Sequence, residues 1–192
     1  MPINLQKGQK ISLDKASPGL EAAFIGLGWD VKKVDTGKDF DIDVSVFLLG
    51  ENERLLSDKH LIFYNNKKSP DSDHSVEHMG DNLTGAGEGD DEVVLVNLTK
   101  IPSEVHKLVF VVTIHEADAR GQNFGQVENA FVRLMDVKTK NEVLRYDLSE
   151  DYSIETALIM AEIYKKDGEW RMSAVGSGYE GGLEAIVNRY YG

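Results

Sequence analysis

Short runs of β-branched and aromatic residues, each bounded by turn-forming residues, recur along almost the whole chain. The clearest run places apolar side chains at every second position from Ile42 to Leu48, with Asp43 and Ser45 between them. A period of two gives a strand one apolar face and one polar face. We expect strands at residues 22–29, 41–49, 60–64, 92–98, 108–114, 129–136, 143–148, 156–164 and 169–175.

The connections between these runs favour a sandwich. Asp167-Gly168 and residues 138–141 have the composition of hairpin turns. Many short strands without long intervening helices predict a mainly β fold, a sandwich of two antiparallel sheets. The apolar residues at 183, 186, 187 and 190 have helical spacing, which predicts a short C-terminal helix packed on the body. No linker or repeat divides the chain, so residues 1–192 are expected to form a single domain.

The charge and composition narrow the classes of partner. The 192 residues carry a formal net charge of −12, which makes bare nucleic acid and anionic membranes poor partners. There is no cysteine, so disulfides, thiolate metal sites and cysteine nucleophiles are absent. The first residues lack the apolar segment of a signal peptide, and no apolar run is long enough to cross a bilayer. A soluble, cytoplasmic protein is therefore expected.

The acidic residues are concentrated in one stretch. Residues 71–92 contain eight carboxylates and no Lys or Arg. Residues 80–92 are too rich in glycine for a helix interior and too polar for a core strand, so we expect a loop. Crowded carboxylates repel one another, and a calcium ion relieves the repulsion by accepting about six to eight oxygens. The residues that supply such oxygens are Asp81, Asn82, Asp90, Asp91 and Glu92.

Further acids lie near predicted strand ends. Asp41 and Asp43 occupy alternate positions and so share a face of their strand. Asp30 closes the preceding predicted strand. Several strand ends therefore present carboxylates at one edge of the sandwich. Charge alone is a weak guide, because acidic runs are most often solvated surface.

Two established metal motifs fit poorly. Residues 81–92 have the length of an EF-hand loop, but Leu83, Gly85 and Ala86 stand where two ligands and a glycine are required. His74 and Glu77-His78 match the H-x-x-E-H zinc-protease pattern, which requires a helix that Pro70 and Gly80 leave no room for. A zinc site on a strand stays open at this point. The glycines at 85, 87 and 89 lack the lysine of a phosphate-binding loop.

Ordered motifs along nearly the whole chain resemble the TerD family of tellurium-resistance and stress-response proteins. The acidic loop, Gly80–Gly85 through Gly89–Glu92, is similar to the most characteristic segment of that family. The other matching segments, in order, are Gly26–Asp30, Phe40–Asp43, Ile62–Asn66, Phe124–Val127, Arg145–Leu148, Glu155–Ala157 and Ala174–Gly176. Ala86 departs from the family pattern, because an acid is common there.

The resemblance implies a β-sandwich that binds calcium, with two ions held by its acidic loops. Carried over by position, the implied ligands are Asp41, Asp43, Asp81, Asn82, Asp90, Asp91 and Glu92, with Asp30 and Asp73 as second-rank candidates. The resemblance also implies action in assemblies with other stress-resistance proteins, near the inner membrane surface, rather than catalysis. We therefore expect a calcium-binding, non-enzymatic interaction module. Two alternatives stay open: a calcium-dependent binder of phospholipid or nucleotide, and a metal-dependent phosphoesterase.

Overall fold

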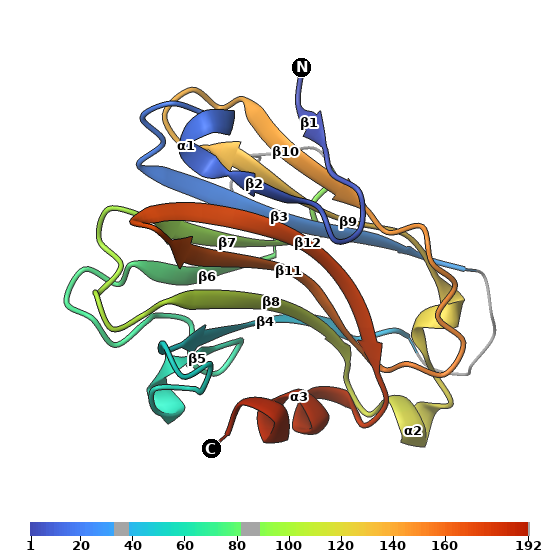
Figure 1. The fold of residues 1–192 in the computed structure, drawn as a ribbon. Helices are drawn as coiled ribbons and strands as arrows, with labels where there is room; N and C mark the ends of the chain where they lie inside the picture. The colour runs from blue at the N-terminus through green and yellow to red at the C-terminus, as the bar shows by residue number, and fades with distance from the viewer. Residues whose placement is uncertain (33–38, 82–88, 192) are drawn as a thin grey trace.

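Two six-stranded sheets stack face to face in the computed structural model, which describes residues 1–32, 39–81 and 89–191 (Figure 1). The first sheet has the order β1 (Ile3–Asn4), β10 (Glu142–Asp147), β9 (Val127–Asp136), β3 (Ala22–Val31), β7 (Glu92–Asn97) and β6 (Val76–Asp81). The second has the order β2 (Lys10–Ser12), β12 (Glu169–Tyr179), β11 (Ala157–Lys166), β8 (Lys107–Ile114), β4 (Ile42–Leu49) and β5 (Leu61–Ile62).

The prediction of a mainly β sandwich with a C-terminal helix is confirmed, with one difference in strand direction. The first sheet is mixed, because β1 pairs with β10 in parallel. The predicted strand at residues 60–64 is only the two residues of β5, preceded by a 3₁₀ turn, η1 (Asp58–His60). The short strands β1 and β2 and the edge strand β6 were missed, because they carry no run of alternating apolar residues.

Helical segments connect and cover the strands. The longest is α3 (Gly182–Tyr190), which confirms the predicted C-terminal helix. The others are α1 (Leu13–Ala16), α2 (Ala117–Arg120) and the 3₁₀ turn η2 (Phe124–Gln126). The described residues contain no helix that is both long and apolar enough to cross a membrane.

The predicted alternation of β4 divides its side chains between two apolar clusters. Ile42, Val44, Val46 and Leu48 belong to the main core between the sheets. Phe47 and Leu49 point to the other face, where α3 covers them with Ile186 and Tyr190. The rings of Phe47 and Tyr190 have centroids 5.4 Å apart. Because α3 covers only the far half of β4, the outer face at Asp43 and Ser45 is left to polar side chains.

The predicted hairpin at Asp167-Gly168 is also confirmed. Asp167 and Gly168 join β11 to β12 with φ values of 52° and 79°, as a two-residue type I′ turn requires. The predicted turn at residues 138–141 joins β9 to β10, with Lys140 at a positive φ.

Candidate functional site

The predicted ligands Asp41 and Asp43 lie where β4 begins. Asp41 is exposed, and its carbonyl accepts a hydrogen bond from the backbone N–H of His115, 2.8 Å away. Asp43 is half-buried and pairs in register with Thr113 of β8. Partial burial, followed by the charges of Asp41 and Glu92, raises the pKa of Asp43 to about 6. Within the part of the chain that the structure describes, no group donates a hydrogen bond to the Asp43 carboxylate.

Glu92 is buried at the start of β7 and links three strands. Its side chain lies on the same face as Val94 and Val96 and so enters the space between the sheets. Its Oε2 accepts a hydrogen bond from the backbone N–H of Val44, 2.9 Å away in the opposite sheet. The same oxygen lies 2.9 Å from Nε2 of His78 on β6. Oε1 keeps its capacity to accept a further contact.

The hydrogen bonds of His78 assign its tautomer. The backbone N–H of Gly80 donates to Nδ1 of His78 at 3.0 Å, so Nδ1 is the acceptor. Nε2 therefore carries the proton that is donated to Glu92. His74 lies elsewhere, with Nδ1 2.9 Å from the carbonyl of Ser69. The structure thus does not bring the two histidines of the H-x-x-E-H pattern together as a pair of ligands.

Asp91 and Asp30 form the next part of the acidic cluster. Asp91 precedes β7, and its Oδ2 accepts a hydrogen bond from the backbone N–H of Trp29, 2.8 Å away. Desolvation of its carboxyl group raises the pKa of Asp91, the Trp29 hydrogen bond opposes this, and the charges of Asp30, Asp90 and Glu92 add to the increase. Asp30, in β3, accepts a hydrogen bond from Nδ2 of Asn129 at 2.8 Å.

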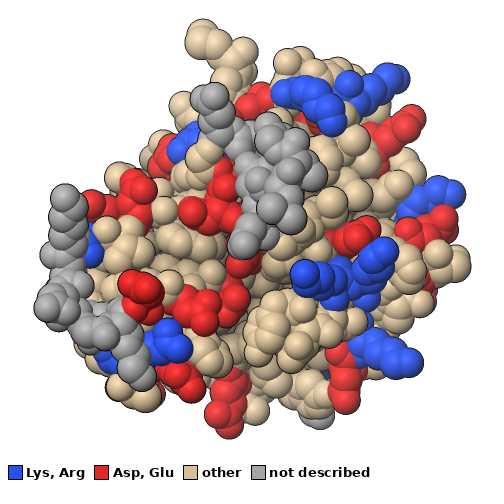
Figure 2. All heavy atoms as spheres, turned by 180° about the vertical axis from the view of Figure 1, so that it is seen from behind, with Lys and Arg blue, Asp and Glu red and all other residues tan. Residues whose placement is uncertain are grey.

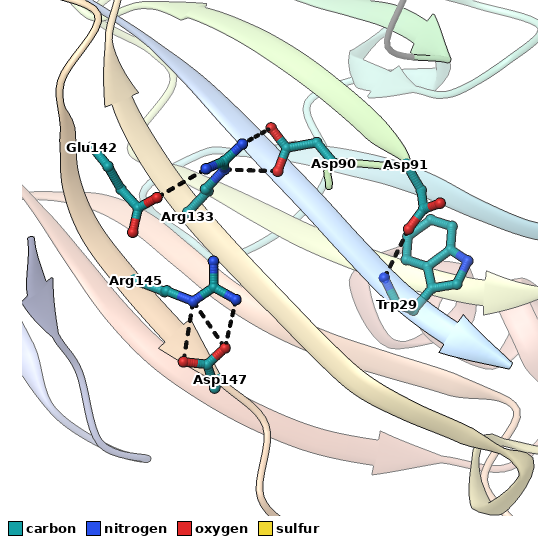
Figure 3. A network of polar contacts seen from close by, with 7 residues as sticks. All are labelled: Trp29, Asp90, Asp91, Arg133, Glu142, Arg145 and Asp147. Carbon is teal, nitrogen blue, oxygen red and sulfur yellow. Dashed lines mark hydrogen bonds and ion pairs between the residues drawn. The ribbon is translucent and has the colours of Figure 1, made fainter. Parts of the chain in front are cut away.

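Asp90 has its charge matched by an arginine on the outer face of the first sheet (Figure 3). Nε and one terminal nitrogen of Arg133 donate to its two oxygens, at 2.8 and 2.9 Å. A further terminal nitrogen of Arg133 donates to Glu142 at 2.9 Å. Burial raises the pKa of Asp90, although the hydrogen bonds and charge of Arg133 oppose the increase. Gly26 makes room for this pair, because a Cβ there would overlap the Asp90 carboxylate.

The remaining predicted ligands lie apart or outside the described residues. Asp73 is exposed and lies 3.8 Å from Nζ of Lys100. The backbone of Asp81 ends β6 opposite Glu92, so Gly80 and Asp81 are strand residues and not loop residues as predicted, whereas Glu92 begins β7 as the predicted strand 92–98 requires. The side chain of Asp81 and the whole of Asn82 lie outside what the structure describes.

The charges that act on Asp43 include Asp41 and Glu92, and those that act on Asp91 are Asp30, Asp90 and Glu92. Glu92 is thus common to both groups of carboxylates, which together are called the acidic cluster. Figure 2 shows Asp and Glu side chains gathered toward the centre of one face of the molecule. Within the described ranges, no three carboxylate or imidazole groups have positions that would by themselves hold a metal ion.

Comparison with known protein families agrees with the fold and the motifs. The model of the TerD domain matches residues 1–190. The chain belongs to the TerD family. General stress protein 16U of Bacillus subtilis is 55% identical over 190 residues, which cover 99% of this chain and 97% of that protein. The tellurium resistance protein TerD of Serratia marcescens is 51% identical over 190 residues, with 99% and 97% covered.

A solved structure of a TerD homologue from Streptomyces coelicolor shares the fold. Its TM-score is 0.65 at 20% sequence identity, and the match covers 88% of this chain and 96% of that one. This likeness supports the sandwich architecture of the TerD domain.

Sequence reasoning missed two residues that organise the cluster. In the sequence His78 matches only a zinc-site pattern, and no residue near it in its strand indicates Glu92 as its partner. Arg133 had a usable signal, because it interrupts the apolar run Phe131–Met135. A lone charge in a run of buried residues predicts a buried partner of opposite charge.

Proposed function

We propose that this TerD-family protein binds calcium through the carboxylates at the start of β4 and β7 and serves a stress response as a non-catalytic interaction module. The observation that supports this most directly is the environment of the Asp43 carboxylate. Its half-buried carboxylate lies beside the charges of Asp41 and Glu92 and has no hydrogen-bond donor among the described residues. A bound divalent cation would match this excess of negative charge.

The donor set suits calcium better than a softer metal ion. Calcium prefers carboxylate, amide and carbonyl oxygens, and the cluster offers carboxylates without thiolates. Asp41 and Asp43 are the described residues that would hold the ion, with the free Oε1 of Glu92 available beside them. Asp91 and Asp30 each keep one carboxylate oxygen outside a hydrogen bond among the described residues. Asp90 is assigned a structural role, because Arg133 engages both of its oxygens.

Of the histidines beside the acidic cluster, His78 contacts Glu92 directly, and His115 acts on Asp43 only through its charge. A metal-assisted hydrolase needs a group that can take a proton from water. His78 contacts the cluster, but it is buried, with both ring nitrogens in hydrogen bonds. Calcium would instead neutralise the acidic edge and couple its order to metal binding. The ordered face is then available to other stress-resistance proteins at the inner membrane surface.

Isothermal titration calorimetry on chelator-treated protein tests the proposal. We expect saturable calcium binding at submillimolar concentration, and weaker binding in Asp43→Asn. Asp58→Asn is the matched control, because Asp58 is an exposed aspartate in η1 and lies outside the acidic cluster. Absence of heat above dilution in the wild-type protein would contradict the proposal.

A further inference from the structure

A cavity of about 400 Å³ lies on the outer face of the second sheet. It is bounded by the ends of β4 and β8, by α2 and by the first turn of α3. Cavities of roughly 300–1,000 Å³ are typical of small-molecule sites. The helix α3 begins beside the cavity and packs over Phe47 and Leu49. It leaves the outer face at Ser45 and Asp43 uncovered, and the cavity lies there.

Two buried hydroxyl groups line the floor of this cavity. Ser45 is 1% exposed and Thr113 is 5% exposed. Both lie on strand faces that point away from the main core, because Val44 and Val112 point into it. Neither hydroxyl has a hydrogen-bond partner among residues 1–32, 39–81 and 89–191. Neither oxygen is among the buried, unpartnered side-chain atoms of the described residues, so both are open to the cavity and available to a ligand that carries hydrogen-bond donors.

Four carboxylates line the cavity, together with one histidine, His115, among the described residues. Asp43 lines its wall, and Asp118 and Glu184 lie exposed at its edge. Glu116 also lines it but forms an ion pair with Arg120 at 3.1 Å. No Lys or Arg is found among the described residues that line the cavity. A phosphate or carboxylate ligand would meet uncompensated repulsion here, whereas a cation would be attracted.

The walls also carry apolar groups, which suit the alkyl part of an organic cation. Ile114, Ala117 and Leu183 line the cavity, and the ring of Tyr64 stands beside them. An aromatic face attracts an ammonium group, and aliphatic walls bury an alkyl chain.

We propose that this cavity binds a small primary alkylammonium compound, with the ammonium group donating to the Ser45 and Thr113 hydroxyls and to Asp43. Three donors on one nitrogen match these three acceptors. The alkyl chain lies against Ile114 and Leu183. The cavity shares Asp43 with the proposed calcium site, whereas Ser45 and Thr113 lie outside the predicted calcium ligands, so the hydroxyl variants test the cavity separately.

Chelator-treated protein titrated with n-butylammonium chloride, followed by ¹H–¹⁵N NMR, tests this inference. We expect saturable shifts of the Ser45, Thr113 and Gly182 amide signals, and no such saturation with n-butanol or with sodium chloride at equal ionic strength. Ser45→Ala and Thr113→Val should each weaken binding about fivefold or more, since each removes a hydrogen bond to a charged group. Ser153→Ala is the matched control, because Ser153 lines a different cavity of about 380 Å³.

Two outcomes would overturn the inference. One is the absence of saturation by n-butylammonium in folded wild-type protein. The other is equal binding by the wild-type protein and both hydroxyl variants, with the NMR spectrum showing that the variants are folded. A calcium titration of the same samples separates this result from the metal site, because Ser45→Ala and Thr113→Val should leave calcium binding unchanged.

Discussion

Glu92 joins the two sheets of the sandwich by accepting a hydrogen bond from the backbone N–H of Val44, 2.9 Å away. The same oxygen lies 2.9 Å from Nε2 of His78. An acidic side chain among the predicted metal ligands is therefore also part of the framework. Because Glu92 takes part in both, a calcium ion bound at the acidic cluster would be coupled to the packing of the core.

Replacing Glu92 by alanine should destabilise the protein strongly. The change leaves the N–H of Val44 and the ring of His78 buried without their acceptor, and we expect a loss of about 3 kcal/mol in unfolding free energy. Glu92→Gln keeps one acceptor oxygen and should lose less, about 1 kcal/mol. Urea unfolding in the presence of chelator measures both. Glu77→Ala on the same edge is the control, because Glu77 forms only a partly exposed pair with Lys68; a similar loss in that variant would argue against the bridge.

Arg133 and Arg145 offer a matched pair of arginines on neighbouring strands (Figure 3). Arg133→Ala removes both hydrogen bonds from the Asp90 side chain, which is 1% exposed, and leaves it only the weaker charge effect of Arg145, so we expect a loss of about 3–5 kcal/mol. Arg145→Ala breaks a pair with Asp147, whose side chain is 60% exposed, and should cost under about 1 kcal/mol. Thermal and urea unfolding of both variants compare them. Equal losses of unfolding free energy in the two variants would show that burial does not make the Arg133–Asp90 pair more stabilising than the Arg145–Asp147 pair.

Gly26 should tolerate no side chain while Asp90 is present. A Cβ at residue 26 would overlap the carboxylate of Asp90, so Gly26→Ala must displace it from Arg133. We expect a loss of about 2–3 kcal/mol, the range of an overpacked site. A double-mutant cycle with Asp90→Ala gives the test, because Gly26→Ala should be much less harmful once the carboxylate is gone. Additive losses would contradict the proposed contact.

The pKa of Asp43 predicts a pH dependence of stability without calcium. In the folded protein the pKa is about 6, compared with 3.8 for the ordinary group, so the folded state holds this proton more tightly. The contribution of Asp43 to stability therefore decreases as the pH rises from about 4 to 7. Asp43→Asn should remove this slope and stabilise the metal-free protein at pH 7.5 by roughly 1 kcal/mol, after allowance for solvent screening.

Urea unfolding of the wild-type protein and Asp43→Asn at pH 5.0 and pH 7.5 checks this dependence. The gain in the variant should be larger at pH 7.5 than at pH 5.0. The exposed Asp58→Asn serves as control. A gain that is the same at both pH values would show that the charge of Asp43 is not the cause.

The sequence predicted the strands whose faces alternate clearly. The apolar positions from Ile42 to Leu48 face the main core, and the last apolar residues before Gly192 form α3. Which strands pair with each other was harder to predict, because strand pairing depends on contacts between residues far apart in the chain. The parallel pairing of β1 with β10 joins residues about 140 positions apart and has no local signal.

The sequence locates the acidic cluster, but it does not show which group of the protein each carboxylate contacts. Asp90 and Asp91 are neighbours with similar local composition, yet one bonds Arg133 on the outer face and the other bonds the backbone of Trp29. Their separation follows from the alternation of side chains where the chain enters β7. Glu92 was predicted at the start of a strand, and only the stacking of the two sheets gives it Val44 as a partner.

Calorimetric titration of calcium into chelator-treated protein at pH 7.5, repeated at pH 5.5, tests the central claim most directly. We predict saturable binding at submillimolar concentration at pH 7.5 and weaker binding at pH 5.5, because Asp43, with a pKa of about 6, must lose its proton to accept the ion. The wild-type protein should also unfold at a higher temperature with calcium present. No binding at pH 7.5, or binding that Asp43→Asn leaves unchanged, would contradict the account.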